Sequence, residues 1–376
     1  MRKWFLFSLC LSSWAVFASP QTELDSLLLV LDNELTHVQD YFDQRDGRIT
    51  SLKQTLANPE IDDNHRIVLL KDLFTEYKSY QADSAISYLQ KRLEWAFAHQ
   101  NQRLIDESRL LQIDYYASIG LYPEAVEVVG LVDTARLSES QYLDYLEATA
   151  HLYGEMASYS QDRFFSQIHM RRSNHLHERL LARLDPNSPR YLRTLEGLLW
   201  YHTPDKAMEI NERLMQESVN NNQEMAMCCF MRALAYERKR DLDQARIWYA
   251  RSAVADLRAG ITDNGSSWKL AQLMNEANDV ERAYRYARYS MENALFYHAR
   301  IRQAQVANSW AIIEKQYQEE MMARHRHMQI TLLIVSLLAV VALVVMIVVA
   351  VQRRKIARMQ RQLKEANDRL TQSNAS

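Results

Sequence analysis

The sequence predicts an all-α protein in which an α-solenoid is followed by one transmembrane helix and a short coiled-coil tail. Its 376 residues include only seven glycines and six prolines, fewer than the turns of a strand-rich chain require. Apolar residues recur at helical spacing through most of residues 20–328. The stretch 330–351 carries no charged side chain and exceeds the roughly 20 residues that a helix needs to cross a bilayer.

The first segment, residues 1–18, has the organisation of a secretory signal peptide. Arg2 and Lys3 precede the apolar run Trp4–Phe17, and a small residue follows at Ala18. We expect cleavage after Ala18. The alternative is an uncleaved anchor, which would leave the topology of the chain unchanged.

Residues 19–58 are expected to form an N-terminal amphipathic helix. Its apolar residues follow alternating three- and four-residue steps, interrupted only by Arg45, and they are Leu28, Leu31, Leu35, Val38, Phe42, Ile49, Leu52 and Leu56. So narrow a stripe suits packing onto the following helices or the seam of a coiled-coil dimer. The sequence leaves both interpretations open.

Residues 59–296 carry a degenerate repeat with the pattern of tetratricopeptide units. Such a unit has two helices, with small residues where the helices touch and aromatic residues in the gaps. In the stretch MRALAYERKRDLDQARIWYARS, Ala233 and Ala245 take the small positions, and Tyr236 and Tyr249 take the large ones. We expect a tetratricopeptide-like, right-handed solenoid with a concave face; an irregular helical bundle is the alternative.

Six helix pairs are expected from the spacing of the small residue in each second helix. At intervals of 38 to 42 residues, this position falls at Ala85, Ala125, Phe165, Ala207, Ala245 and Ala283. A phenylalanine is a poor fit for a position where two helices touch. The unit that contains Phe165 is therefore the least regular of the series.

The membrane-proximal part is expected to be one continuous helix. Residues 297–329 form its juxtamembrane part, residues 330–351 span the membrane, and residues 352–376 form the tail. The tail carries seven basic and two acidic residues, whereas only Arg324 and Arg326 stand shortly before the span. Because short basic flanks stay in the cytoplasm, we expect a single-pass protein of a bacterial inner membrane with a periplasmic ectodomain.

The tail carries an apolar heptad pattern that predicts a cytoplasmic coiled-coil linker and favours a homodimer. The expected seam positions are Ile356, Met359, Leu363, Ala366 and Leu370. Two to three heptads are too short to be stable on their own.

Charge and cysteine content limit the ligands of the ectodomain. The formal net charge of the chain is −2, and the signal peptide and tail are both basic, so the ectodomain between them is acidic. This argues against nucleic acid as a ligand. Only Cys228 and Cys229 lie outside the signal peptide, and adjacent cysteines on a helix suggest core packing over redox chemistry.

No motif in the sequence points to catalysis. It contains no phosphate-binding glycine-rich loop, no G-x-S-x-G and no H-E-x-x-H. The segment HMRRSNHLH places His169, His175 and His177 at spacings that do not suit a zinc site. We expect no enzyme activity, no catalytic residue, no cofactor and no metal.

A concave surface of helical repeats suits a protein, a peptide or a glycan as ligand. From the repeat pattern, the groove-facing positions of the first helices are expected to include Asp114, Glu237, Arg238, Trp268, Gln272 and Asn275. These six are the candidate ligand-binding residues. The membrane and a periplasmic ligand are the expected partners, with no nucleic acid bound by the chain itself.

Over residues 1–376 the chain resembles a Bacteroidota family of membrane-anchored, tetratricopeptide-containing regulators, a domain of unknown function. The resemblance rests on the segment YQADSAISYLQKRLEWA and on Tyr41, Arg45, Arg48, Ile49, Leu52 and Lys53. It implies a signal peptide, periplasmic helical repeats, one membrane span and a cytoplasmic coiled coil. Family members continue into a helix-turn-helix output domain, and we expect this chain to be without it, as a fragment or as a regulator that works through a partner.

The leading functional hypothesis is a sensor. Its solenoid would bind a ligand or protein in the periplasm, and its membrane helix would pass the change to a missing or separate cytoplasmic output, expected to be transcriptional. The alternative is a non-enzymatic envelope scaffold for protein assembly. A truncated sensor kinase is a third hypothesis, although no histidine that could accept a phosphate follows Val351.

Overall fold

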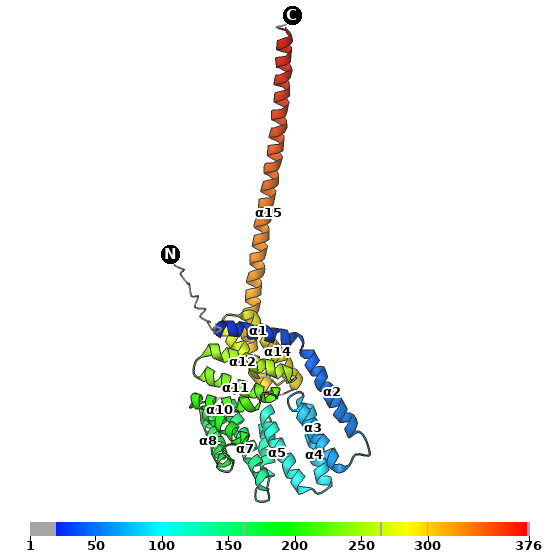
Figure 1. Cartoon of the computed structure of the whole chain (residues 1–376), viewed down its shortest axis with the longest axis vertical. Coiled ribbons are helices and arrows are strands. Elements are labelled where there is room, and N and C mark those ends of the chain that lie inside the picture. The colour runs from blue at the N-terminus through cyan, green and yellow to red at the C-terminus, as the bar shows by residue number, and fades with distance from the viewer. Residues whose placement is uncertain (1–19, 161, 264, 299, 374–376) are drawn as a thin grey trace, which may run out of the picture. The chain divides into compact units, whose positions relative to one another are not determined.

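The computed structural model describes residues 20–160, 162–263, 265–298 and 300–373, and every regular element within them is an α-helix (Figure 1). The all-α prediction is confirmed. The helices are α1 Pro20–Thr36, α2 Val38–Leu56, α3 Asp63–Tyr77, α4 Ala82–Ala98, α5 Gln102–Ile119, α6 Tyr122–Gly130, α7 Glu139–Tyr159, α8 Arg163–Leu181, α9 Pro189–Leu199, α10 Pro204–Glu217, α11 Asn222–Arg238, α12 Leu242–Arg258, α13 Gly265–Glu276, α14 Val280–Tyr297 and α15 Arg300–Ser373.

Helices α3 to α14 form six consecutive pairs, and each pair packs as a helical hairpin. The fourth residue of every second helix is small, and its N–H donates to the carbonyl just before the helix. The five alanines predicted for this position occupy it and are at most 2% exposed. A small side chain there lets the two helices of a pair approach closely.

The prediction for the third pair was wrong by one residue. Ser166 occupies the fourth position of α8, and its N–H donates to the carbonyl of Asp162 over 3.3 Å. Phe165 is instead 55% exposed. The two residues before Ser166 are both phenylalanines. The repeat pattern alone therefore could not show which residue of this segment takes the small position.

The helix expected over residues 19–58 is two helices, which meet at His37. Leu28 and Leu31 of α1 are buried against α12, whereas Ile49 of α2 is buried against α3 and α4. The apolar stripe therefore packs within the chain, as the first of the two sequence interpretations had it. Arg45, the polar residue in the stripe, is itself buried, with 5% of its surface exposed.

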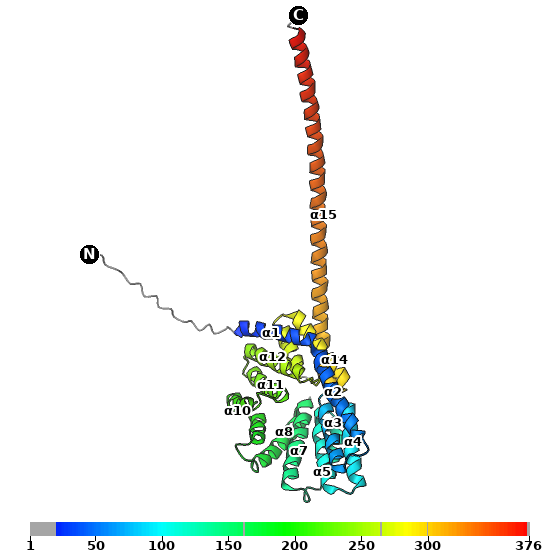
Figure 2. The same cartoon turned by 45° about the vertical axis from the view of Figure 1, so that its right-hand side comes forward.

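The first helix pair is fastened to the last two pairs by contacts that we call the closing clamp: Arg45, Ser79, Gly260, Thr262 and Tyr297. Arg45 Nη1 donates to the carbonyl of Gly260 over 2.6 Å, and Nη2 donates to Ser79 Oγ over 3.0 Å. The N–H of Thr262 donates to the carbonyl of Ser79. The Tyr297 hydroxyl donates to the carbonyl of Lys78. The repeat domain is thus closed on itself, with α2 and α3 beside α14 (Figures 1 and 2).

Gly260 is the position in the closing clamp where the backbone requires glycine. Its φ is +62°, a left-handed conformation that side chains with a Cβ rarely adopt. A Cβ at Gly260 would also lie 3.3 Å from the carbonyl oxygen of Tyr41. The close approach of α2 to this turn therefore depends on the missing side chain.

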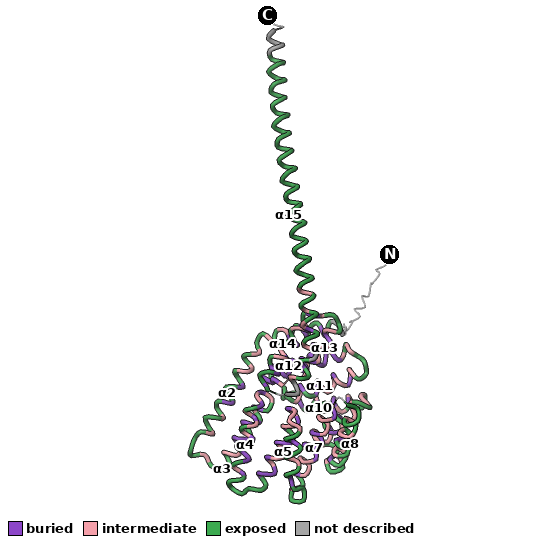
Figure 3. The backbone as a smooth tube through the Cα atoms, turned by 180° about the vertical axis from the view of Figure 1, so that it is seen from behind, coloured by how far each residue is buried: buried purple, intermediate pink, exposed green. Residues whose placement is uncertain are grey.

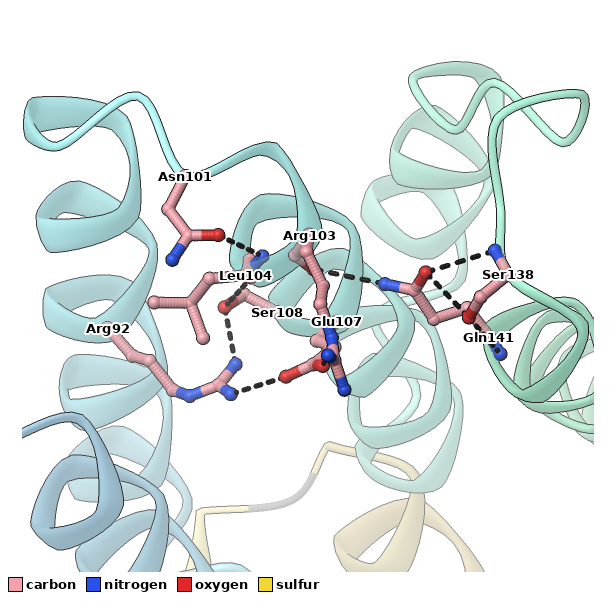
Figure 4. A network of polar contacts seen from close by, with 8 residues as sticks. All are labelled: Arg92, Asn101, Arg103, Leu104, Glu107, Ser108, Ser138 and Gln141. Carbon is pink, nitrogen blue, oxygen red and sulfur yellow. Dashed lines mark hydrogen bonds and ion pairs between the residues drawn. The ribbon is translucent and has the colours of Figure 1, made fainter. Parts of the chain in front are cut away.

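A second buried arginine joins α4 to α5, and a glutamine joins α5 to α7 (Figure 4). Arg92 Nη1 donates to Ser108 Oγ over 2.6 Å, and Nη2 contacts Glu107 at 3.0 Å. Gln141 Nε2 donates to the carbonyl of Arg103 over 3.0 Å. Because a buried charge is costly without partners, these contacts fix the relative positions of three successive helices.

The junction between the third and fourth pairs, which we call the α8–α9 junction, differs from the others. Among the described residues, no cluster of buried apolar side chains contains residues from both α7–α8 and α9–α10. Instead, Arg190 of α9 reaches Asp144 and Glu147 of α7 at 2.8 and 2.6 Å. This junction is held mainly by charge.

Helix α15 begins after a left-handed residue, His298, at φ +64°. The juxtamembrane helix therefore starts at Arg300, three residues later than expected. Val306 and Ile313 are buried in the largest core cluster, and the helix continues unbroken to residue 373. The chain divides into two compact units after Ile313.

The second unit contains one stretch that is long and apolar enough to cross a membrane. Its side chains are exposed throughout residues 330–351, as the green tube of Figure 3 shows. The predicted signal peptide at residues 1–18 and the side chain of Leu370 lie outside the described residues.

Candidate ligand-binding face

Ion pairs connect the first helices of successive repeats from α5 to α13. We call this set the polar ladder; its distances are 2.7, 2.6, 2.5 and 3.0 Å, and its pairs are Asp114–His151, Glu147–Arg190, Glu224–Arg193 and Lys269–Glu237. Each pair joins one repeat to the next. The ladder therefore links the first helices of successive repeats, the helices that were expected to line the groove.

Water reaches this face, so a ligand can reach it too. The side chain of Asp114 is 54% exposed and that of His151 is 35% exposed. The other members of the ladder have intermediate exposures. Ion pairs at this level of exposure contribute little to stability, about 0–1 kcal/mol each. Replacing one of these ion pairs with contacts to polar groups of a ligand would therefore lose little stabilising free energy.

His151 is the most strongly perturbed group on the polar ladder. Desolvation alone would lower its pKa, but the hydrogen bond and charge of Asp114, together with Glu155 and Glu147, raise the pKa of His151 to about 9. Desolvation acts to raise the pKa of Asp114, and the hydrogen bond and charge of His151 outweigh it and lower the pKa. At neutral pH the pair is consequently an imidazolium and a carboxylate.

Glu196 is a buried carboxyl group on α9, the helix that carries two arginines of the polar ladder. Asn211 Nδ2 donates to Glu196 Oε1 over 2.7 Å and to the carbonyl of Cys228 over 2.9 Å. Desolvation raises the pKa of Glu196 to about 7, although Asn211, Arg193 and Arg232 act to lower it. The fourth repeat thus carries a carboxyl group that titrates near neutrality.

Three of the six predicted ligand-binding residues keep a polar surface position. Asp114 and Glu237 belong to the polar ladder, and Glu237 also accepts a 2.6 Å hydrogen bond from the Tyr249 hydroxyl. Arg238 lies over the Tyr201 ring at 4.0 Å and donates to the Tyr201 carbonyl. Arg238 is therefore occupied at the α9–α10 turn.

The other three predicted residues do not offer a free surface. The prediction for Trp268 was wrong, because its side chain lies in the core with 6% of its surface exposed. Gln272 Nε2 donates to Ser309 Oγ on α15 over 3.1 Å, and Asn275 is half-buried. The repeat pattern failed at Trp268 because this side chain packs into the core cluster, and a pattern of isolated repeats does not include the contact of Gln272 with α15.

Sequence reasoning missed all four basic members of the polar ladder. His151 lies 37 residues after Asp114, and Lys269 lies 32 residues after Glu237. Both separations are close to the length of one repeat. An acidic and a basic residue about one repeat apart were therefore the signal in the sequence that could have revealed these pairs. The exact pairing depends on irregular loop lengths between helices, which the sequence pattern does not fix.

The side chains of this face offer charge and hydrogen-bonding groups. Among the described residues, no group of three His, Cys, Asp or Glu side chains is placed to hold a metal ion. Cys228 and Cys229 are both buried, and burial raises the pKa of the Cys229 thiol to about 12. Thiols in such surroundings are unreactive, in agreement with the core-packing interpretation.

The predicted coiled-coil seam is exposed along the last part of α15. Ile356, Met359 and Leu363 are 51%, 61% and 76% exposed, and Ala366 is exposed as well. These side chains have no apolar partner within the described chain. They remain available for the dimer that the heptad pattern predicts.

A comparison with protein families finds one match over most of the chain. The model of the SusR N-terminal TPR domain matches residues 35–308. The matched range runs from the end of α1 into α15, and it includes all six helix pairs, the closing clamp and the polar ladder. No curated protein matches the chain.

Proposed function

Because the chain belongs to the family of the SusR N-terminal TPR domain, we propose that it is a membrane-anchored sensor that regulates a cytoplasmic output. The repeat domain binds a ligand or protein, and α15 carries the resulting change to the tail. The expected output is transcriptional. The proposal describes a regulator and assigns it no enzymatic step.

The continuity of α15 is the observation that carries this proposal. One helix holds Val306 and Ile313 in the core of the repeat domain, contains the apolar stretch 330–351 and ends in the heptad pattern of the tail. A rigid helix transmits a shift or rotation along its length, whereas a flexible linker does not. The continuity of this helix supports the proposal that a change in the repeats reaches the tail.

The polar ladder is the proposed binding face. A polar ligand, whether peptide, protein or glycan, would replace the weak ion pairs of the ladder with contacts of its own. Two of these pairs, Glu147–Arg190 and Glu224–Arg193, flank the fourth repeat. Ligand binding there would change the relation between the two halves of the repeat domain.

We place the protein in a bacterial inner membrane, with the repeats in the periplasm, the tail in the cytoplasm and two chains in the active unit. The apolar stretch supports the single span, and the basic residues after it support the orientation. The exposed seam at Ile356, Met359 and Leu363 supports the homodimer.

Deletion of residues 352–376 tests the sensor hypothesis against the scaffold hypothesis. Transcripts would be compared by RNA sequencing in strains that carry the full chain, the tail deletion or no chain. A sensor without its tail should give the transcript profile of the strain without the chain. If the tail deletion keeps the profile of the full chain, the sensor hypothesis fails and an envelope scaffold becomes the better description.

A further inference from the structure

Helix α1 shows how an acidic amphipathic helix binds a basic outer helix of this solenoid. Glu23 and Glu34 of α1 contact Arg251 and Arg258 of α12, each at 2.6 Å. Between them, the leucines of α1 are buried in the core cluster that includes Ile247 of α12. Two carboxylates three helical turns apart therefore bracket an apolar contact.

Helix α8 repeats this arrangement in the same register. Arg172 and Arg179 are the tenth and seventeenth residues of α8, the positions that Arg251 and Arg258 hold in α12. Each first arginine is followed by a serine, Ser173 in α8 and Ser252 in α12. The hydroxyl of each serine donates to a carbonyl of the preceding helix, over 2.7 and 2.8 Å. The sixth residue is isoleucine in both helices.

The two helices differ in what covers them. Within the described part of the chain, no carboxylate forms an ion pair with Arg163, Arg171, Arg172 or Arg179 of α8. Arg172 lies over the Tyr153 ring at 5.4 Å, and Arg179 donates to the Tyr142 hydroxyl. Next to these arginines, Phe164 and Phe165 are 69% and 55% exposed. We call this surface, Phe164, Phe165, Ile168, Arg172 and Arg179, the basic face of α8.

We propose that the basic face of α8 binds an acidic amphipathic helix of a partner protein, as α12 binds α1. The partner helix would carry two carboxylates three turns apart, one for Arg172 and one for Arg179. Apolar side chains of the partner helix between these carboxylates and beyond the one that meets Arg172 would cover Ile168 and, about one turn nearer the start of α8, Phe165. This surface lies on an outer helix and is distinct from the polar ladder, so the inference does not depend on the proposed ligand site.

The geometry favours a protein helix over an anionic membrane surface. The apolar side of α8 is already used, since Ser173 and Leu180 are buried inside the repeat domain. The exposed side offers two phenylalanines at one end and no continuous stripe for insertion into lipid. Guanidinium groups that lie over tyrosine rings present a planar edge, which suits carboxylates.

A labelled synthetic peptide of residues 20–36 is the probe, because it has the charge spacing that the basic face requires. Its binding to the full chain in nanodiscs of uncharged lipid would be measured by fluorescence anisotropy. We expect saturable binding that weakens about tenfold or more in the double variant R172E/R179E, since like charges facing each other repel. A peptide with Glu23→Lys and Glu34→Lys should bind that variant and not the unaltered chain.

Two controls separate this binding from other effects. R288E alters an exposed arginine on α14 and should leave the affinity unchanged, and Phe165→Ser should weaken binding without any change of charge. The same variants would be tested against phosphatidylglycerol vesicles. The proposal is overturned if the peptide fails to bind, if R172E/R179E binds it as well as the unaltered chain, if the charge-swapped peptide does not restore binding, or if only the vesicles respond to the basic face.

Discussion

The closing clamp and the α8–α9 junction both join the two halves of the repeat domain, and they do so by different means. At the closing clamp, Arg45 and Tyr297 are at most 5% exposed and bind backbone carbonyls of distant helices. At the α8–α9 junction, Arg190 forms ion pairs with half-exposed carboxylates. One connection is fully buried, and the other joins a partly buried arginine to half-exposed carboxylates.

This difference indicates where the repeat domain opens. Local opening has a low free energy where few apolar contacts are lost and the polar groups can be solvated. The α8–α9 junction meets both conditions, and the polar ladder runs across it. The closing clamp meets neither, so it should stay intact while the halves move, and it would keep the base of α15 fixed to the first repeat.

Replacement of Arg45 by alanine should have the largest effect on this comparison. Arg45→Ala removes the hydrogen bonds to Gly260 and Ser79 and leaves their polar atoms in a buried site. Loss of one partner from a buried charged network costs about 3–5 kcal/mol. Urea unfolding of the full chain in detergent, followed by circular dichroism, should show a decrease in the free energy of unfolding of this size.

Arg48 provides the matched control. Both Arg45 and Arg48 lie on α2 and pair with Glu76 of α3, at 3.3 and 3.1 Å, but the side chain of Arg48 is 52% exposed. Arg48→Ala should cost less than about 1 kcal/mol. Equal losses for the two variants would show that the buried position of Arg45 has no special importance.

The next effect is a pH dependence that arises at Glu196. Its folded-state pKa of about 7 lies above the ordinary value of 4.5, so the folded protein binds the proton more tightly than the unfolded chain. Stability therefore falls as the pH rises from about 4.5, and the full loss of about 3 kcal/mol is reached above pH 7. Glu196→Gln should be more stable than the unaltered chain by that amount at pH 8.5.

At pH 4 the same substitution should have almost no effect, because Glu196 is protonated in both the folded and the unfolded chain. The measurement is a pair of urea titrations at pH 4 and pH 8.5. A stabilisation that is the same at both pH values would mean that the carboxyl group of Glu196 does not titrate as its surroundings imply.

A smaller effect is expected from the hydroxyl group at the end of α14. Tyr297→Phe removes the 2.6 Å hydrogen bond to the carbonyl of Lys78 but keeps the buried ring. The expected cost is about 1–2 kcal/mol, the value of one hydrogen bond plus an unpaired buried carbonyl. Hydrogen exchange should become faster at the 78–81 turn and in α14, and unchanged exchange there would remove Tyr297 from the closing clamp.

The smallest effect on global stability should come from the α8–α9 junction. Arg190→Gln breaks the ion pairs with Asp144 and Glu147 and should cost less than about 1 kcal/mol. Hydrogen exchange in α9 should nevertheless accelerate, because these pairs hold a junction without a shared apolar cluster. A loss comparable to that of Arg45→Ala would contradict the distinction between the two connections.

Local features of the fold could be predicted from the sequence, because they repeat. The alanines at positions 85, 125, 207, 245 and 283 fall at the start of each second helix, where a small residue is required. Phe165 was misplaced by one residue because this helix carries serine in the small position. The closing clamp was not predictable, since Arg45 and Gly260 are 215 residues apart and neither belongs to the repeat pattern.

The candidate site was only partly predictable for the same reason. Asp114 and Glu237 were chosen correctly as surface positions of the first helices, but their partners His151 and Lys269 depend on loop lengths. Trp268 was misassigned because its burial in the core cluster is not visible in the pattern of a single repeat. Interactions within one repeat leave a signal in the sequence, and interactions across the closed domain do not.

Disulfide cross-linking in the tail tests most directly whether the repeat domain controls it. Leu363→Cys would be introduced into the full chain, and the rate of cross-link formation in native membranes would be compared with and without Arg45→Lys, which weakens the closing clamp. A sensor with one continuous helix predicts a changed rate. An unchanged rate, in protein whose hydrogen exchange shows a loosened clamp, would contradict transmission through α15.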